Sequence, residues 1–335
     1  MTPVVSVVLP CRDAEATLAE CIASLDAQTL GAYEVIAVDD ASSDGTRPML
    51  DAWAARDSRV RVIEPSGEGL VPALRAGTDA ARAALIARMD ADDVADSTRL
   101  EEQLGFLTEH RGLAACGTGV EYFPRDQMGS GLERYERWIN SLRTPAEIRR
   151  DLLVECPIAH PTLMIRKTVL DAVGGYRDEG WPEDYDLILR LHLAGLRCAN
   201  LHAVLLAWRV TATRLSDRAP QYDADAFRRC RVHFLRHGFL PPSRPIVVWG
   251  AGRVGKAVAR ELIRQGIQPA AFIDLDPRKI GQEMHGARVL GAGELDEAPD
   301  AYFLVAVGTP GARGEIRDAL EAAGRREIED FRAVA

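Results

Sequence analysis

The first 110 residues alternate between short apolar runs and amphipathic helical stretches, and this alternation constrains the fold more than any other feature. Val4–Leu9 is an apolar, mostly β-branched run interrupted only by Ser6, which is typical of a strand buried on both faces. The next stretch places apolar residues on one face of a helix, at Leu18, Cys21, Ile22 and Leu25. Further strand patterns follow at 34–40, 60–63 and 85–89, separated by helical patterns. This order predicts an α/β fold with a mostly parallel sheet covered by helices.

A proline-rich stretch, Pro241–Pro245, is the best boundary in the second half of the chain. Before it, from about residue 111, short strand patterns mix irregularly with helical ones. After it, a new α/β pattern begins at Ile246. We therefore predict a first domain over 1–218, a helical connector and linker over 219–243, and a smaller Rossmann-like α/β domain over 244–335.

Composition excludes several classes of protein. The formal net charge is −9, with 41 basic and 50 acidic residues, which disfavours non-specific nucleic-acid binding. The six cysteines form no C-x-x-C pair and fit no zinc spacing, which favours a reducing compartment. The N-terminal apolar run lacks a basic region before it and is interpreted as a strand, and no apolar stretch is long enough to cross a bilayer. We expect a cytoplasmic protein.

Acidic residues follow two of the predicted strands at their carboxyl ends, where open parallel sheets bind ligands. Asp39 and Asp40 end one strand, and Asp90, Asp92 and Asp93 follow another. Carboxylates crowded in this way suit a divalent cation such as Mg²⁺ or Mn²⁺, which in turn binds phosphates. The alternative is that these acids cap the following helices.

Several segments resemble the family 2 glycosyltransferases, which have the GT-A fold and use nucleotide-diphosphate sugars. The resemblance is carried by residues 5–13, 38–46 and 87–93, and then by 156–162, 174–176 and 183–187 with Arg190. It covers about residues 1–216. It implies an inverting transferase that moves a sugar to a hydroxyl acceptor, which is a glycan, a glycolipid or a small molecule.

The resemblance implies a role for each matching donor-side residue. Asp40 would hold the donor's base, with Asp13 beside it, and Asp90 and Asp92 would form a D-x-D motif that contacts the ribose and the metal. The donor-binding set also includes Pro10, Arg12 and Arg75. Many relatives have an aromatic residue where Arg12 stands, so base stacking is either replaced by the guanidinium or lost. Arg75 either reaches a phosphate or is a surface arginine.

On the acceptor side, Asp184 would be the general base that takes the acceptor's proton, with Glu183 beside it. The alternative for this pair is a favourable charge at a helix start. His160 either lines the acceptor side or contacts the metal, or it is a core histidine. Arg209, Arg214 and Ser216 fall where relatives place a loop that covers the substrate.

The C-terminal part carries Gly250, Gly252 and Gly255 as a G-x-G-x-x-G motif between a strand and a helix, with Asp274 at the position of a ribose-binding acid. It resembles small Rossmann-like domains attached to sugar-modifying enzymes. Three interpretations stay open: a nucleotide or nucleotide-sugar site, a packing or dimerisation module, and a dehydrogenase.

A metal-dependent glycosyltransferase is the leading hypothesis for the whole chain. An NAD(P)-dependent oxidoreductase acting through the C-terminal part and a non-catalytic nucleotide-sugar sensor are the alternatives. The expected partners are a nucleotide-diphosphate sugar, an unidentified hydroxyl acceptor and a divalent cation, and no nucleic acid. A homodimer and peripheral association with the inner face of the membrane stay open.

Overall fold

The structure, a computed structural model, describes residues 2–211 and 219–335. It divides into two compact units that do not follow chain order. The first consists of Met1–Ile148, Pro157–Glu179 and Asp186–Arg218, and the second of Arg149–Cys156, Gly180–Tyr185 and Ala219–Ala335. Two short internal segments, 149–156 and 180–185, thus group in space with the C-terminal part. The domain boundaries at 218 and 243, which divide the chain into consecutive stretches, stay a proposal.

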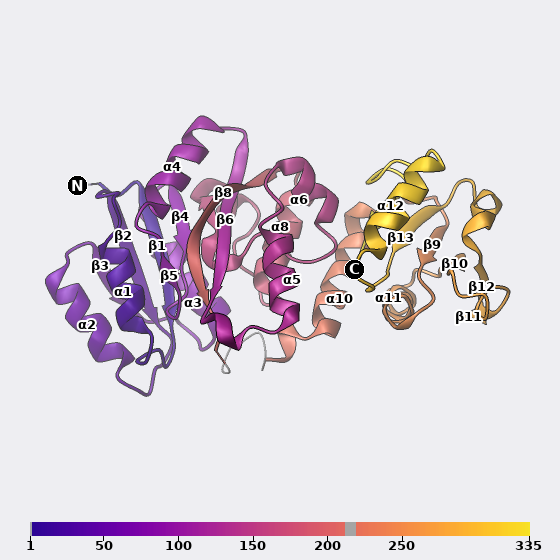
Figure 1. Ribbon diagram of the computed structural model, residues 1–335. Helices are drawn as coiled ribbons and strands as arrows, with labels where there is room; N and C mark the ends of the chain where they lie inside the picture. The colour runs from indigo at the N-terminus through magenta and orange to yellow at the C-terminus, as the bar shows by residue number, and fades with distance from the viewer. Residues whose placement is uncertain (1, 212–218) are drawn as a thin grey trace. The chain divides into compact units, whose positions relative to one another are not determined.

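The first unit is built on one sheet of eight strands in the order β3-β2-β1-β4-β7-β6-β8-β5 (Figure 1). Its parallel half consists of β1 (Val5–Cys11), β2 (Tyr33–Asp39), β3 (Val60–Ile63) and β4 (Leu85–Arg88). The other half consists of β5 (Val94–Ala95), β6 (Leu113–Phe123), β7 (Met164–Arg166) and β8 (Arg197–Arg209). There β7 is antiparallel to both of its neighbours, β6 and β8 are parallel, and β5 is antiparallel to β8. The α/β fold with a mostly parallel sheet is confirmed.

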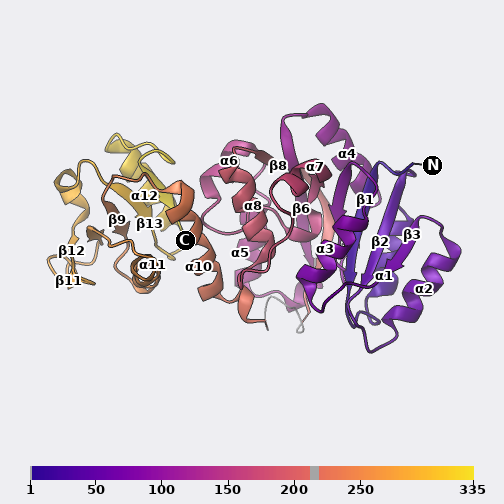
Figure 2. The ribbon, with the colours of Figure 1, turned by 180° about the vertical axis from the view of Figure 1, so that it is seen from behind.

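Helices cover both faces of this sheet. They are α1 (Leu18–Asp26), α2 (Thr46–Arg56), α3 (Leu70–Ala80), α4 (Arg99–Glu109), α5 (Ser130–Ile139), α6 (Pro145–Asp151), α7 (Lys167–Ala172) and α8 (Glu183–Leu193). Of these, α1 lies in front of β1 and β2 in Figure 1, whereas α3 lies on the opposite face, nearer the viewer in Figure 2. The last residues of α6 and the first of α8 belong to the second unit.

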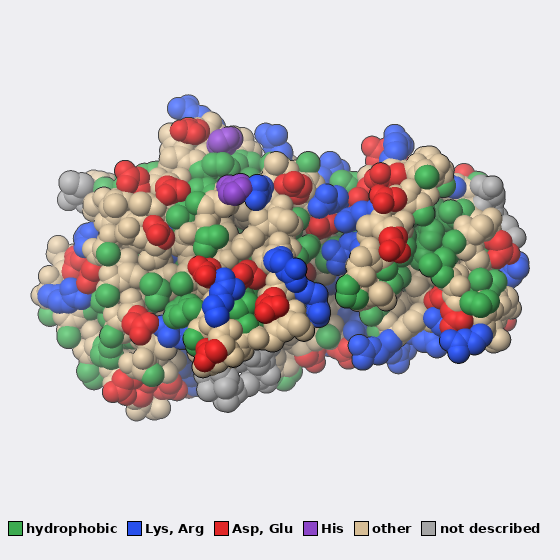
Figure 3. Space-filling view, in the orientation of Figure 1, with side chains coloured by type: hydrophobic (Ala, Val, Ile, Leu, Met, Phe, Trp, Pro, Cys, Tyr) green, Lys and Arg blue, Asp and Glu red, His purple; other side chains and the backbone are tan. Residues whose placement is uncertain are grey.

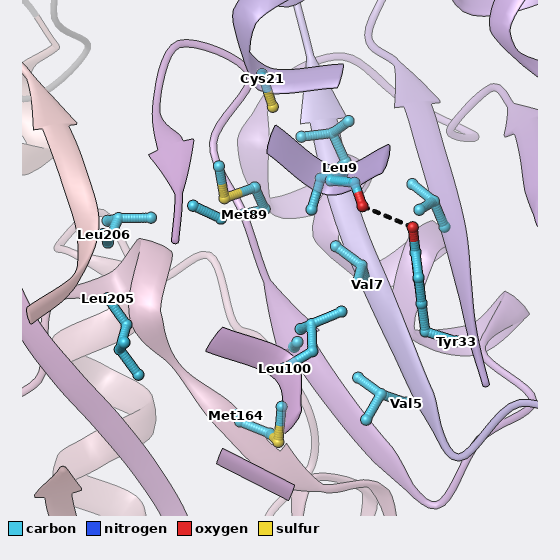
Figure 4. Close-up of a cluster of buried hydrophobic side chains, with 14 of the residues drawn as sticks. Val5, Val7, Leu9, Cys21, Tyr33, Met89, Leu100, Met164, Leu205 and Leu206 are labelled. Atoms are coloured by element: carbon cyan, nitrogen blue, oxygen red, sulfur yellow. Dashed lines mark hydrogen bonds between the residues drawn. The ribbon is translucent and has the colours of Figure 1, made fainter. Parts of the chain in front are cut away.

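Strand β1 sends alternate side chains to the two faces of the sheet, as the pleat requires. Val7 and Leu9 join the core cluster that includes Cys21 of α1 (Figure 4). Val8 points the other way, toward α3, where a Cβ at Gly77 would come within 2.4 Å of its Cγ1. Gly77 therefore permits the close approach of α3 to the strand. All seven residues of β1 are buried, and all except Ser6 are apolar.

The second unit contains a smaller sheet in the order β11-β12-β10-β9-β13-β14. The strands are β9 (Ile246–Trp249), β10 (Ala271–Ile273), β11 (Glu283–Met284), β12 (Ala287–Leu290), β13 (Tyr302–Val305) and β14 (Phe331–Ala333), and all pairs are parallel except β11 with β12. Its longer helices are α10 (Ala224–Phe234), α11 (Arg253–Arg264) and α12 (Ala312–Ala322). The chain reverses its direction of winding beside β9, which is the topology of a doubly wound sheet.

Charged side chains of both signs are interspersed over the elements of the first unit on the face shown in Figure 3. Among the residues that the structure describes, no helix combines the length and the apolar character that crossing a bilayer requires.

Candidate functional site

Three carboxylates converge on the turn that follows β4. One oxygen from each of Asp90, Asp92 and Asp93 lies within 4.8 Å of the other two. Asp93 is fully buried, and its Oδ1 accepts a hydrogen bond from the backbone amide of Arg209 at 2.8 Å. Its Oδ2 has no hydrogen-bond partner among the described residues. Burial, together with repulsion from Asp90 and Asp92, raises the pKa of Asp93 well above its ordinary value.

The chemistry of this acidic turn fits a divalent cation. Carboxylate oxygens are the ligands that Mg²⁺ and Mn²⁺ prefer, and the crowding of three like charges around an unpartnered buried oxygen is relieved by a cation. Part of that relief comes from within the chain, because the buried Arg88 forms an ion pair with Asp90. The sequence analysis did not single out Arg88. A charged residue at the end of a buried strand, two residues before Asp90, was nevertheless a usable signal.

Arg209, at the end of β8, clamps the acidic turn. Its Nε donates to the carbonyl oxygen of Asp92 at 2.7 Å, in addition to the backbone bond to Asp93. Its guanidinium also lies 4.4 Å from the ring centroid of Phe123 and pairs with Glu20. Sequence places Arg209 in a substrate-covering loop, whereas in the structure it ends β8 and bonds to the D-x-D turn, 117 residues earlier in the chain.

Arg214 and Ser216, expected in the same covering loop, lie outside the described residues.

Asp40 is buried directly after β2, beside a cavity of about 430 Å³ whose lining includes Asp39, Glu64 and Glu68. The backbone amide of Gly69 donates to both of its carboxylate oxygens, at 2.8 and 3.0 Å. Arg12 Nη1 lies 3.3 Å from Asp40 Oδ2, and this guanidinium is half exposed. Arg12 Nη2 also lies 3.8 Å from Glu68 Oε2, so its guanidinium pairs with two acids that line the cavity. Stacking of this guanidinium on a base stays a prediction.

Asp13 and Pro10 support this corner from β1. Asp13 has a left-handed backbone conformation with φ of 46°, and its Oδ1 accepts from the amide of Ser43 at 2.7 Å. It therefore ties the loop after β1 to the loop after β2. Pro10 lies within β1 opposite Val38 of β2, so it shapes the strand end.

Arg75 and His160 meet at the same tyrosine. Arg75 Nε donates to the backbone carbonyl of Tyr176 at 2.9 Å, so in this structure it joins α3 to the turn at 174–176. His160 is buried, and its Nε2 lies 3.0 Å from Tyr176 Oη. His160 is thus a buried histidine beside a side-chain hydroxyl, and both its place on the acceptor side and its role in the core stay predictions.

Glu183 and Asp184 begin α8 and belong to the second unit. Glu183 is buried, and Tyr222 Oη donates to its Oε2 at 2.5 Å. Asp184 is half-buried, and its Oδ1 accepts from the amide of Tyr185 at 2.7 Å. Asp40, Asp90 and Asp92 belong to the first unit, whereas Glu183 and Asp184 belong to the second.

The glycine motif lies between β9 and α11, where sequence placed it. Gly250 has φ of 123°, and a Cβ at Gly255 would come within 1.6 Å of the Gly250 carbonyl oxygen, so both positions require glycine for packing. A Cβ at Gly252 would meet nothing within 4 Å, and its backbone is extended. Packing therefore explains two of the three glycines.

Asp274 is held inside its own loop. Its Oδ2 accepts from the amide of Ala251 at 2.8 Å and from Lys279 Nζ at 2.9 Å, and its Oδ1 accepts from the amide of Asp276 at 2.9 Å. Burial opposes ionisation, but these bonds lower the pKa of Asp274 below its ordinary value. The carboxylate therefore organises the glycine loop directly.

Comparison with known proteins connects this geometry to one family. The profile described as "Glycosyl transferase family 2" matches residues 6–174. The putative glycosyltransferase EpsE of Bacillus subtilis (strain 168) is 33% identical over 238 residues, covering 68% of this chain and 82% of EpsE.

Solved structures share the fold. TarS 1–349 of S. aureus in complex with UDP-GlcNAc gives a TM-score of 0.56 at 17% identity, over 79% of this chain and 72% of that one. The mannosyltransferase PcManGT from Pyrobaculum calidifontis, in complex with GDP-Man and Mn²⁺, gives 0.52 at 17% identity, over 80% and 66%.

The profile match includes both donor-side acid groups and ends before the acid pair and the second sheet. The resemblance of the first part to the glycosyltransferases is thus confirmed, whereas a Rossmann-like identity for the second sheet stays a prediction. The chain belongs to glycosyl transferase family 2.

Proposed function

We propose that this glycosyltransferase transfers a sugar, with inversion, from a nucleotide-diphosphate sugar to a hydroxyl acceptor, assisted by a divalent cation at Asp90 and Asp92. The observation that carries the proposal is the convergence of three carboxylates after β4, one of them with a buried oxygen that lacks a partner among the described residues. The oxidoreductase alternative is not favoured, because the family match and the relatives are those of glycosyltransferases.

The donor's two ends are assigned to different residues of the first unit. Asp40 accepts N–H groups of the base, and Arg12 pairs with Asp40 and Glu68, which both line the cavity. Asp90 and Asp92 hold the cation, with Asp93 behind them and Arg209 fixing the turn. A bound Mg²⁺ or Mn²⁺ would supply the positive charge that stabilises the departing diphosphate. The nucleotide sugars and the Mn²⁺ named for the two solved neighbours support this assignment.

Asp184 is assigned as the general base. The acceptor hydroxyl oxygen forms a bond to the anomeric carbon, the bond from that carbon to the diphosphate oxygen breaks, and the hydroxyl proton moves to the carboxylate of Asp184. A single displacement of this kind inverts the anomeric centre. Glu183 is buried and bonded to Tyr222, so it is assigned a supporting role on the acceptor side.

A nucleotide site at the glycine motif of the second unit is the second proposal. Gly252 supports it, because neither strain nor crowding explains a glycine there, whereas close approach of a ligand to the backbone does. Asp274 would then accept from a ribose hydroxyl only in competition with Lys279. Packing or dimerisation is the alternative role for this sheet.

We propose that the acceptor is a glycan, a glycolipid or a small molecule. We also propose that the protein acts in the cytoplasm at the inner face of the membrane, and that it forms a homodimer. The cysteines support this location, because all six are buried and none of them forms a disulfide bond.

The test of the metal assignment is a thermal-shift titration with UDP-GlcNAc and GDP-Man, with and without Mn²⁺, and with NAD(P)H. A ligand that binds only the folded state raises the melting temperature. We expect one nucleotide sugar to stabilise the protein only with Mn²⁺, and Asp92→Asn to abolish that effect. Asp79→Asn, the same change at an exposed position on α3, is the control and should keep it. Mn²⁺-dependent stabilisation that persists in Asp92→Asn contradicts the assignment, and stabilisation by NAD(P)H alone revives the oxidoreductase.

The base assignment needs a second variant pair. Asp184→Asn should keep the Mn²⁺-dependent stabilisation by the donor and lose transfer, because donor contacts belong to the first unit. Asp178→Asn, at an exposed position, should keep both. Retained transfer in Asp184→Asn would remove Asp184 from the mechanism.

A further inference from the structure

The acid pair is built into the same compact unit as the C-terminal sheet. Residues 180–185, with Glu183 and Asp184, and residues 149–156 group with 219–335. The matched family profile ends at residue 174, so this packing lies outside what family membership describes. The contacts within the second unit therefore show what holds Asp184 in place.

Tyr222 makes the most direct of these contacts. It ends the short helix Pro220–Tyr222, and its hydroxyl donates to Glu183 Oε2 at 2.5 Å. Glu183 is 2% exposed, so little water is available to replace this donor. Hydrogen bonds to charged acceptors are about twice as strong as neutral ones. Because Glu183 precedes Asp184 in the chain, fixing its side chain also fixes the first turn of α8.

Arg231 of α10 bonds to the segment 149–156, which belongs to the same unit as the acid pair. Its guanidinium is buried, with Nη1 donating to the carbonyl of Val334 at 2.6 Å and Nη2 to the carbonyl of Val154 at 2.7 Å. One side chain thereby ties the residue after β14 to the segment 149–156. Tyr185 Oη, next to Asp184, reaches the same segment by donating to the carbonyl of Leu152 at 2.9 Å.

Electrostatics gives a second reason for an arginine at position 231. Glu155 is a half-buried carboxyl group whose Oε1 accepts from the amide of Cys156 at 3.1 Å. Desolvation raises the pKa of Glu155, the Arg231 charge opposes that rise, and the Asp184 charge adds to it. Without the guanidinium, the carboxyl groups of Glu155 and Asp184 would repel each other with less compensation, and that repulsion would favour a different orientation of α8.

We propose that Tyr222 and Arg231 are positioning residues for sugar transfer: they orient the first turn of α8, so that the C-terminal part of the chain sets the direction of the Asp184 carboxylate. The inference rests on the assignment of Asp184 as the base. Both residues belong to the second unit, whereas the donor-side acids Asp40, Asp90 and Asp92 belong to the first. We therefore expect their loss to affect turnover rather than donor affinity.

The first experiment is Tyr222→Phe, which removes one hydroxyl at a partly exposed site. With the nucleotide sugar selected by the thermal-shift screen, Mn²⁺ and glycerol as acceptor, release of the nucleoside diphosphate is followed against donor concentration. We expect kcat to fall about tenfold, with donor KM and the Mn²⁺-dependent thermal shift unchanged. Tyr302→Phe, which removes another tyrosine hydrogen bond of the second unit, to the carbonyl of Ile328, is the control and should leave kcat unchanged.

A double-mutant cycle assigns the effect to the hydrogen bond. In a Glu183→Gln background, Tyr222→Phe should lower kcat less than twofold further, because its charged acceptor is gone. An equal tenfold loss in both backgrounds would overturn the proposed route through Glu183.

Arg231→Lys tests the second anchor. Lysine keeps the charge but cannot donate in a fork to two carbonyls, so kcat should fall again at unchanged donor KM. Arg244→Lys, which also removes a guanidinium that bonds several carbonyls of the second unit, is the matched control. If Arg231→Lys does not fold, the Tyr222 variants decide alone.

Hydrogen exchange of the peptide 180–190 gives a readout that needs no acceptor. Exchange at the start of α8 should quicken about tenfold in Tyr222→Phe and not in Tyr302→Phe. Retained transfer in Asp184→Asn would defeat the base assignment. Lost transfer in Asp184→Asn, with kcat and exchange both unchanged in folded Tyr222→Phe and Arg231→Lys, would overturn the positioning inference alone.

Discussion

Asp151 offers a specific test of how a buried ion pair contributes to the free energy of unfolding of the second unit. Its side chain is 3% exposed, its Oδ2 lies 3.2 Å from Arg150 Nη2, and its Oδ1 pairs with Arg317 of α12. Arg317 also keeps Glu327, at 2.9 Å. The carboxylate thus joins the segment 149–156 to the C-terminal helix, and Asp151→Asn removes its charge at nearly constant volume.

The expected loss follows from the burial of the pair. Removing one partner of a buried ion pair costs about 3–5 kcal/mol. Arg317 retains Glu327 and Arg150 is 40% exposed, so neither arginine is left wholly uncompensated. We therefore expect Asp151→Asn to lower the free energy of unfolding of the second unit by about 2–3 kcal/mol at neutral pH. Asp225→Asn, whose carboxylate pairs with Arg228 and is 71% exposed, should cost about 1 kcal/mol or less.

The pH dependence gives the test a second arm. Burial opposes ionisation of Asp151, but the hydrogen bond from Arg150 and the charge of Arg317 outweigh it and lower its pKa. A carboxyl group with a folded-state pKa below its unfolded value, about 3.9, stabilises the protein fully above that unfolded value. The stabilisation is lost as the pH falls through the folded-state pKa, so the difference between the wild type and Asp151→Asn should vanish in strong acid.

Urea unfolding at several pH values, with hydrogen exchange of peptides from α12, measures this difference for the second unit. A loss no larger than that of Asp225→Asn at neutral pH would refute the burial argument. A loss that stays constant down to about pH 2 would show that the carboxylate charge is not its cause.

Two further outcomes follow from the structure. Gly255→Ala should unfold the second sheet or lower its melting temperature sharply, because its Cβ would overlap the Gly250 carbonyl, whereas Gly252→Ala should leave stability within about 1 kcal/mol of the wild type; circular dichroism melts of both variants check this. The six cysteines should resist alkylation at pH 8 until denaturant is added, because all are buried and burial raises the pKa of Cys116 and Cys198 to about 12; mass spectrometry of iodoacetamide-treated protein counts the modified thiols.

The parallel half of the first sheet was predictable because its signal is local. The run at β1 is apolar at every position except Ser6, because both faces of the strand are covered. The acids after β2 and β4 follow from the rule that parallel strands end at one edge of a sheet. The other half was not predictable in detail. The three residues of β7 join β4 to β6 in antiparallel pairs, and a strand that short has no period to read.

The candidate site also has one part that the sequence predicts and another that it does not. The D-x-D carboxylates stand next to one another in the chain, so their convergence needs no knowledge of the fold. The clamp by Arg209 joins residues 117 apart, and the bond from Tyr222 to Glu183 joins residues 39 apart. Side chains that act across such separations are set by packing, which residue spacing does not encode.

The interleaving of the second unit has a consequence for how the chain is made. Asp151 is synthesised 166 residues before its partner Arg317. Val154 bonds to Arg231, which also bonds to Val334, 103 residues further along the chain. At about 5–20 residues per second, translation separates Asp151 from its partner by about 10–30 s. The first unit runs to Arg218, so the donor half can be complete on the ribosome only in the later part of that interval, while the C-terminal residues that pack with the acid pair are still missing. A chain terminated in that part should bind a nucleotide sugar without transferring the sugar.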